Sequence, residues 1–355
     1  MSETPISLSE IERWLREDDP VQLEALWQRA DDMRHAHVGE AVYLRGLLEI
    51  SNHCCRQCAY CGVRAGNTSV TRYRMSADEI LACAHMAARL EYGTLVIQSG
   101  EDFGATGDWV AELIRRIKTE TGCAVTLSLG ERREEEVRLW HAAGADRYLL
   151  RFETSNPAHF AVIHPKLPGG YEDRFETLRL LREVGYEVGS GMLIGFPGQT
   201  WADLAQDIWT LREQDFDMIG AGPYVPHPET PMGRDEARLR APEGEQVPAS
   251  DVSAYKVIAL ARILCPTANI PSTTAIATLN RASGRVSALQ RGANIVMPNL
   301  TPAKYRRLYE IYPAKAGSTE TPEESDRRAR EQIASIGRAI GKGHGDSRHF
   351  TARVQ

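Results

Sequence analysis

Residues 47–62 read LLEISNHCCRQCAYCG, a short apolar run followed at once by four cysteines. The run LLEIS has the length and the aliphatic content of a buried strand. Cys54, Cys55, Cys58 and Cys61 follow its end, and three of them form a C-x3-C-x2-C pattern. Thiols this close together, in a chain whose other cysteines are scattered, indicate a metal site and not disulfides. We therefore predict a strand whose C-terminal end carries a metal-binding loop.

Similar apolar runs recur along the chain between amphipathic segments and give eight candidate strands, which begin near residues 47, 94, 124, 147, 189, 217, 269 and 293. Helix start signals stand between them, because Ser76 precedes Glu79 by three residues and Thr200 precedes Asp203 in the same way. Gly185 is placed to end a helix. Strict alternation of strands and helices implies a parallel sheet with helical crossovers. Eight repeats favour an α/β fold of the (β/α)8 TIM-barrel type, with a six-stranded, partly closed sheet as the alternative.

The pattern divides the chain into three predicted parts. Residues 1–40 are predicted to form an N-terminal helical lead-in of two helices, the first opened by a capping box at Ser7. Residues 41–313 hold the barrel, and residues 314–355 form a polar C-terminal helix and tail, which we expect to be a peripheral appendage. Within the barrel, the Pro- and charge-rich stretch 232–250 is predicted to be a long surface loop, placed to act as a lid.

The composition excludes several classes of protein. The chain of 355 residues is 42% hydrophobic and 25% charged, which is ordinary for a globular protein and excludes a disordered or fibrous one. Its net charge of −6 provides no basic field, so neither nucleic acid nor an anionic membrane surface is an expected partner. No apolar stretch approaches the roughly 20 residues that a membrane span needs, and the N-terminus shows no signal-peptide pattern. We expect a cytoplasmic protein whose cysteines are reduced.

Two kinds of metal centre fit the cysteine spacing. A structural zinc ion would need Cys55 or His53 as a fourth ligand, and such sites usually combine two separated ligand pairs, whereas the chain has no second C-x2-C. An iron–sulfur cube held by three thiolates would leave one iron without a protein ligand. An open metal position of that kind can accept a substrate, as a catalytic centre requires. The extra cysteine, Cys55, is predicted to point away from the metal.

Polar stretches follow the predicted strands at the points where a barrel places its active site. Besides the cysteine loop, they are 98–101, 128–131, 151–154, 195–200, 223–228, 272–274 and 297–299. Each stretch alone has the composition of a capped turn. Their gathering at one end of a barrel favours an active site over a set of unrelated turns.

An aromatic residue, Tyr60, precedes the last cysteine of the C-x3-C-x2-C motif. This motif, at the first strand of a βα barrel, resembles that of the radical S-adenosylmethionine (SAM) superfamily. Further stretches within residues 35–315 are similar, in the same order, to the HydE family of FeFe-hydrogenase maturases: 98–102, 126–131, 147–151, 198–200, 222–228, 271–275, 292–299 and 301–313. The resemblance implies a radical SAM enzyme with one 4Fe-4S cluster on Cys54, Cys58 and Cys61, whose free iron binds SAM. An electron from the cluster would cleave SAM to methionine and a 5′-deoxyadenosyl radical.

The resemblance also assigns residues to the cofactor and to the substrate. SAM is expected to contact Tyr60, Gln98, Ser99, Gly100, Glu101, Ser128, Glu153 and Arg174. The charges fit, because a carboxylate such as Glu153 suits the SAM amino group and a guanidinium such as Arg174 suits its carboxylate. Catalytic and substrate-binding positions in the barrel interior are expected at Thr126, Arg147, Arg151, Thr273, Thr274, Met297, Tyr309 and Tyr312. The alternative for the arginines is a structural role in ion pairs with nearby acidic residues.

The implied substrate is an iron atom bound to cysteine and carrying carbonyl and cyanide ligands, supplied by a HydG-like maturase. Arginine, threonine and tyrosine side chains would donate to its cyanide nitrogen and carboxylate oxygen. The implied product is a reduced iron species for the two-iron subcluster of the hydrogenase H-cluster. A HydF-like maturase and an electron donor are the further partners.

Two departures from the family pattern affect these expectations. No cysteine follows Cys265, so the accessory cluster of many family members is expected to be absent. Phe152 stands where the family has a histidine, which puts any role of that imidazole in doubt. A radical SAM amino-acid mutase similar to methylornithine synthase and a zinc-stabilised binding barrel without radical chemistry remain as alternatives. A biotin-synthase-like reaction is disfavoured, since Cys123 alone cannot hold the second cluster that biotin synthase needs.

Overall fold

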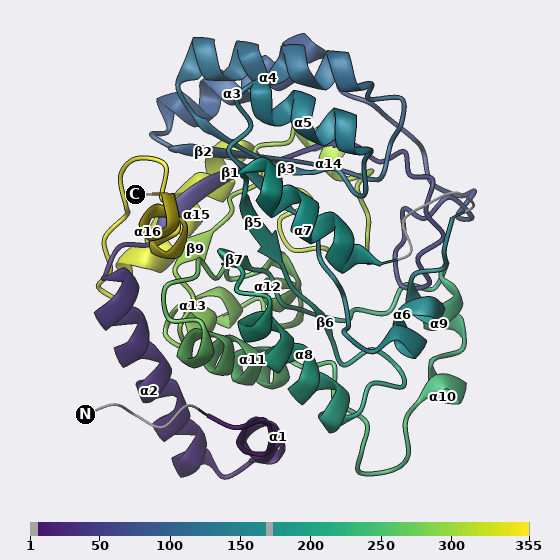
Figure 1. Cartoon of the computed structure of the whole chain (residues 1–355), viewed down its shortest axis with the longest axis vertical. Helices are drawn as coiled ribbons and strands as arrows, with labels where there is room; N and C mark the ends of the chain where they lie inside the picture. The colour runs from purple at the N-terminus through teal and green to yellow at the C-terminus, as the bar shows by residue number, and fades with distance from the viewer. Residues whose placement is uncertain (1–5, 168–172, 355) are drawn as a thin grey trace.

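A barrel of parallel strands forms the centre of the computed structural model, which describes residues 6–167 and 173–354 (Figure 1). The strands are β1 (Tyr43–Ser51), β2 (Thr94–Ser99), β3 (Ala124–Ser128), β4 (Arg147–Leu149), β5 (Glu187–Ser190), β6 (Leu193–Ile194), β7 (Met218–Ile219), β8 (Gly222–Pro223) and β9 (Ile295–Val296). Seven of them pair in the order β7-β5-β4-β3-β2-β1-β9, and all of these pairs are parallel. The two others, β6 and β8, form a short parallel pair of their own.

The two edges of the seven-stranded sheet meet through the segment at residues 269–271. Asn269 forms a parallel bridge with Met218 of β7, and Pro271 forms one with Ile295 of β9. Backbone hydrogen bonds of 2.9 Å accompany both bridges. The strands therefore curl into a TIM-type barrel, and the predicted fold class is confirmed.

Seven of the eight predicted strands are found as regular strands. The exception is the run that begins at residue 269, which makes only isolated bridges. Pro271 lies within this run and has no amide hydrogen, so it cannot take part in a continuous ladder on both sides. The runs at 189 and 217 are each split into two short strands. The backbone passes closely there, because a Cβ on Gly191 would lie 1.9 Å from the carbonyl oxygen of Gly220.

Helices surround the barrel and extend the chain at both ends. They are α1 (Leu8–Arg16), α2 (Pro20–Val38), α3 (Ala77–Arg89), α4 (Gly107–Thr121), α5 (Glu134–Ala142), α6 (Pro157–Ile163), α7 (Arg174–Val184), α8 (Trp201–Glu213), α9 (Pro231–Arg234), α10 (Glu236–Leu239), α11 (Asp251–Leu264), α12 (Thr274–Leu279), α13 (Gly284–Leu289), α14 (Ala303–Arg306), α15 (Pro322–Ala334) and α16 (Arg348–Val354). In Figure 1, α3, α4, α5 and α7 cover one side of the barrel, and α8 and α11 cover another. None of the described helices combines the length and the apolar character of a membrane span.

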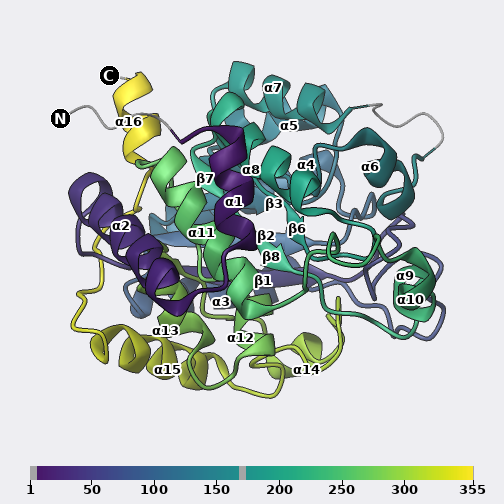
Figure 2. The same ribbon diagram turned by 90° about the horizontal axis from the view of Figure 1, so that it is seen from below.

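The helix signals read from the sequence are confirmed. Ser7, Ser76 and Thr200 cap α1, α3 and α8 with capping boxes, and Gly185 ends α7 at a φ of +110°. The predicted N-terminal lead-in is α1 and α2, which pack against α8 and α11 (Figure 2). The stretch 232–250 is not the simple loop that we predicted, because it contains α10 and part of α9. Its action as a lid stays a prediction.

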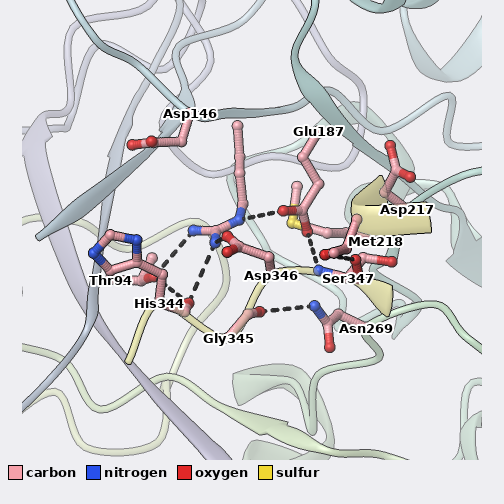
Figure 3. A network of polar contacts seen from close by, with 12 residues as sticks. Thr94, Asp146, Glu187, Asp217, Met218, Asn269, His344, Gly345, Asp346 and Ser347 are labelled. Carbon is pink, nitrogen blue, oxygen red and sulfur yellow. Dashed lines mark hydrogen bonds and ion pairs between the residues drawn. The ribbon is translucent and has the colours of Figure 1, made fainter. Parts of the chain in front are cut away.

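The C-terminal segment closes the end of the barrel at which the strands begin. Figure 3 shows residues 344–347 among side chains from β2, β5 and β7. Thr94 Oγ1 donates to the carbonyl oxygen of His344 over 2.7 Å. The buried guanidinium of Arg45 donates to the carbonyl oxygen of Gly345 over 2.8 Å. Backbone carbonyls of the segment thus satisfy polar side chains inside the barrel.

A buried ion pair lies at the centre of this closure. Arg147, the first residue of β4, is completely buried, and its Nε donates to Glu187 Oε2 over 2.7 Å. Arg147 also pairs with Asp346 of the C-terminal segment, and Glu187 Oε1 accepts from the backbone amide of Ser347 over 3.2 Å. Because both members of the pair bind the segment, residues 314–355 are not the peripheral appendage that we expected. The domain boundaries themselves stay predictions.

We expect Glu187→Gln to lower the free energy of unfolding by about 3 kcal/mol, because it removes the buried carboxylate from the buried Arg147 cation. Glu134→Gln is the control, since it breaks an exposed i,i+4 pair with Arg138 and should cost less than about 0.5 kcal/mol. Urea titration followed by circular dichroism measures both values. Equal losses for the two variants would contradict a special contribution from the buried pair.

Candidate functional site

A cavity of about 340 Å³ lies inside the barrel at the end where the strands finish. Its wall includes Glu49 from β1, Gln98 from β2, Ser128 from β3 and Leu149, the last residue of β4. Alternate strand residues point to the same face, which explains why side chains from successive strands meet in this space. The cavity therefore lies at the end of the barrel for which the sequence predicts an active site.

The cysteines lie on the irregular loop between β1 and α3. Cys54, Cys58 and Cys61 line the cavity. Cys55 does not, as predicted, and its Sγ lies 3.6 Å from Glu101 Oε1. The loop packs tightly on the end of β2, because a Cβ on Gly100 would lie 2.2 Å from the carbonyl oxygen of the residue before Cys54.

Arg72 holds the two ends of the cysteine loop together. Its guanidinium donates to four backbone carbonyls, those of Asn52, Val63, Arg64 and Asn67. Hydrogen bonds from one planar group to both ends of a loop restrict its path, so that the thiols approach the cavity in a fixed arrangement.

The thiols fit an iron–sulfur cluster. Burial raises the pKa of Cys61 to about 12 and also raises the pKa values of Cys54 and Cys58. Thiols in such surroundings become thiolates when a metal compensates their charge. The backbone amides of Arg56 and Glu101 act against the rise in the pKa of Cys54, and amides stabilise cluster thiolates in the same way. Three thiols around one open cavity are the donor set of a 4Fe-4S cluster with one free iron.

A chain of buried ion pairs runs beside the cysteine loop. Arg56 Nε donates to Glu101 Oε1 over 2.8 Å, and the same guanidinium pairs with Glu131. Arg174 Nε donates to Glu131 Oε1 over 2.9 Å and its Nη2 bonds to His164 Nε2. Burial, followed by the charge of Arg174, lowers the pKa of His164 to about 2, so the imidazole is neutral. The two arginines and two glutamates balance in charge, which makes their burial tolerable.

Glu153 follows β4 and reaches the cavity from a strained backbone. Its φ is +67°, a conformation that costs a residue other than glycine roughly 1–2 kcal/mol. Its carboxylate accepts from Tyr60 OH over 2.9 Å and from Arg151 Nε over 3.1 Å. Strain of this kind persists where a structure holds a side chain in a functional position.

Most of the predicted site residues line this one cavity, while their roles stay predictions. The lining residues are Cys54, Cys58, Cys61, Tyr60, Gln98, Ser99, Gly100, Glu101, Ser128, Glu153, Arg174, Arg151, Thr273, Thr274, Met297, Tyr309 and Tyr312.

Two predicted residues, Arg147 and Thr126, lie elsewhere. The placement of Arg147 at the cavity was wrong, because Arg147 and Arg151 are four residues apart on one extended chain, roughly 13 Å. Arg147 therefore forms the ion pair at the opposite end of the barrel, which is the structural alternative. Thr126 pairs in register with Arg147, below the cavity, and its Oγ1 is buried without a partner among the described residues.

Some cavity residues were not predicted from the sequence. Arg56 and His164 line the wall beside the cysteine loop, and Glu49 and Lys315 form a buried pair with 2.5 Å between Nζ and Oε1. The sequence could have predicted Arg56 as a cavity residue, since it is a charged residue inside the cysteine motif. It could not have predicted Lys315, because that residue lies beyond the expected end of the barrel.

Phe152 lies outside the cavity. Its ring centroid is 5.4 Å from that of Phe175 and 6.3 Å from that of Phe216, within the hydrophobic core. Successive residues along an extended chain point in opposite directions, so Arg151 and Glu153 face the cavity while the residue between them faces the core. The departure from the family histidine therefore lies outside the cavity wall of this chain.

Known proteins of similar sequence place this geometry in a family. Residues 48–208 match the model of the Radical SAM superfamily. The chain is 44% identical over 294 residues to the FeFe hydrogenase maturase subunit HydE of Thermotoga maritima, which covers 82% of this chain and 80% of that protein. The chain belongs to the HydE family of radical SAM enzymes. The resemblance to the radical SAM superfamily and the resemblance to the HydE family, both drawn from the motifs, are confirmed.

Two proteins that are not named HydE are similar to this HydE-family chain at lower sequence identity. It is 26% identical over 277 residues to 3-methylornithine synthase of Methanosarcina acetivorans, which covers 78% of this chain and 74% of that protein. The solved structure of methylornithine synthase PylB has a TM-score of 0.81 at 21% identity, over 96% of this chain and 95% of that one, and shows a shared fold. Membership of the HydE family contradicts the alternative of a zinc-stabilised barrel without radical chemistry and disfavours the mutase.

In this HydE-family enzyme, we expect Cys54→Ala to abolish cluster assembly and Cys55→Ala to leave it intact, because only the first of these thiols faces the cavity. Iron and sulfide analysis after anaerobic reconstitution, with about four irons per loaded chain, measures the outcome. Visible absorbance provides a second readout. Equal iron contents in the two variants would show that the ligand assignment is wrong.

Proposed function

We propose that this enzyme acts on an iron atom that is bound to cysteine and carries carbonyl and cyanide ligands. Its product would serve the two-iron subcluster of the hydrogenase H-cluster. One 4Fe-4S cluster on Cys54, Cys58 and Cys61 and SAM are the proposed cofactors. HydG-like and HydF-like maturases and an electron donor are the proposed partners. The similarity to a protein named FeFe hydrogenase maturase subunit HydE supports this setting.

The proposed substrate is supported by hydrogen-bond donors in the cavity wall that have no partner among the described residues. Thr273 and Tyr224 line the cavity, and their hydroxyl oxygens are buried without a hydrogen-bond partner among the described residues. A buried hydroxyl left unpaired costs about 1–3 kcal/mol, so a ligand that accepts hydrogen bonds would explain both positions. Cyanide nitrogen and carboxylate oxygen are such acceptors. Arg151 adds a charged donor to the same wall.

Glu153 and Arg174 are the proposed partners of the SAM amino and carboxylate groups. Arg174 already donates to Glu131, to His164 and to the carbonyl oxygen of Arg151. A guanidinium has five N–H donors, so two of them remain for a carboxylate. Burial opposes the charge of Arg174, yet the carboxylate of Glu131 raises its pKa overall, which keeps the group a donor.

A bound cluster would supply the electron that cleaves SAM to the 5′-deoxyadenosyl radical. The chain itself contributes placement and exclusion of water. Leu149, Leu193 and Met297 share the cavity wall with the polar donors. Apolar side chains in these positions keep water from the reacting groups, which suits radical chemistry.

We expect Glu153→Gln to weaken SAM binding about tenfold, because the SAM ammonium group loses a charged acceptor. Glu134→Gln, which changes an exposed carboxylate on α5, is the control and should bind SAM as the parent does. Equilibrium dialysis with cluster-loaded protein under anaerobic conditions gives the affinities, and iron content confirms that both variants hold the cluster. Unchanged SAM affinity in Glu153→Gln would remove this residue from the cofactor site.

Turnover tests the proposed substrate. Reduced, cluster-loaded protein with SAM receives either a cysteine-bound iron carbonyl/cyanide compound or free lysine, and mass spectrometry follows the products. We expect a new product from the iron compound and none from lysine. Rearrangement of lysine without conversion of the iron compound would identify a mutase and overturn the proposal.

A further inference from the structure

A second cavity, of about 120 Å³, adjoins the main one. We call it the annex; it lies between α13, α15 and residues 315–320. Arg285 of α13, Lys315 and Arg328 of α15 line both cavities, so the two spaces meet at these side chains. A ligand in the annex would therefore lie beside the proposed reaction site.

The annex has more cations than carboxylates. Among the described residues, its charged wall consists of Arg281, Arg285, Lys315, Arg328 and Glu320. Glu320 pairs with Arg328, and Lys315 pairs with a glutamate outside the annex over 2.5 Å. Arg281 is exposed and donates to a backbone carbonyl over 2.8 Å. Arg285 is the one cation of this wall, among the described residues, to which these contacts give no partner.

Arg285 lacks a partner of its own. It is 7% exposed, and its guanidinium forms no hydrogen bond or ion pair within residues 6–167 and 173–354. Burial, followed by the positive charge of Arg328, lowers the pKa of Arg285 to about 10. The charge of Glu320 acts against this decrease but does not offset it, and no carboxylate contacts the Arg285 guanidinium directly within the described residues. A buried cation without a bonded counter-charge is costly, and proteins normally pair it. The annex therefore fits an anionic group.

Two acceptors without partners belong to residues of the annex wall. Glu320 Oε2 and Gln332 Oε1 are buried atoms that have no hydrogen-bond partner in the described part of the chain, and both residues line the annex. An inorganic anion would pair with Arg285 but would leave these two oxygens unsatisfied. A small molecule with both a carboxylate and an ammonium group satisfies all three.

We propose that the annex binds a free α-amino acid, whose carboxylate pairs with Arg285 and whose ammonium group donates to Glu320 and Gln332. The small volume favours an amino acid with a short side chain. The substrate proposed above carries cysteine, so the annex would hold the amino acid that the reaction consumes or releases. That last step rests on the proposed function, whereas the binding site does not.

A titration of the full, cluster-loaded chain in saturating SAM tests the annex, because SAM then occupies the free iron. L-Serine, which has no thiol, is titrated by calorimetry beside ethanolamine, which lacks the carboxylate, and 3-hydroxypropionate, which lacks the ammonium group. We expect saturable binding of one L-serine per chain and binding of the two analogues that is weaker by about tenfold or more.

Variants locate the binding. Arg285→Gln should weaken L-serine binding about tenfold or more, whereas Arg281→Gln, which removes an exposed cation from the same wall, should change it less than about twofold. Circular dichroism and iron content check that both variants fold.

Three outcomes would overturn the proposal: no saturable binding of L-serine, equally tight binding of 3-hydroxypropionate, or equal effects of the two variants. The first two are measured on the unmodified chain, so the test does not depend on the folding of Arg285→Gln. Since binding is measured without turnover, its failure leaves the proposed reaction standing. Failure of the turnover experiment likewise leaves the annex result standing.

Discussion

An arginine that is taken out of water needs a carboxylate or another acceptor, and this requirement shapes both ends of the barrel. Where the strands begin, Arg147 pairs with Glu187, and the C-terminal segment covers the pair. Where the strands end, Arg56 and Arg174 share Glu131 beside the cysteine loop. The C-terminal segment closes the barrel at the first of these ends, and the cavity lies at the second.

The strained backbone at Glu153 persists because the residues that follow it are tied down. Asp207 of α8 is buried and accepts from Thr154 Oγ1 over 3.1 Å and from the amide of Ser155 over 2.5 Å. Gln199 Nε2 donates to its other oxygen over 3.1 Å. Burial raises the pKa of Asp207 to about 7, yet these three groups hold it in place. One carboxylate outside the cavity therefore fixes the loop that carries Glu153.

The fold could be predicted where each element has a local signal, as Ser76 and Gly185 do for the helices that they begin and end. The same local pattern failed at Pro271, because a proline inside an apolar run does not form a regular ladder. The alternation of side chains along a strand also predicts the face to which a residue points. It does not predict at which end of the barrel that residue lies. Arg147 and Arg151 share a face, and only their distance along the strand separates a structural residue from a cavity residue.

The remaining site residues depend on contacts that no local window contains. Lys315 and Glu49 are 266 positions apart in the sequence, yet their side chains form one buried pair in the cavity wall. The polarity of the C-terminal segment suggested a peripheral tail, but buried charges inside a barrel need polar partners. The carbonyl oxygens of His344 and Gly345 and the carboxylate of Asp346 supply such partners at one end of the barrel, and Lys315 lies in the cavity wall at the other. Composition alone therefore does not tell whether such a segment is peripheral, because backbone groups that any sequence carries can satisfy buried side chains.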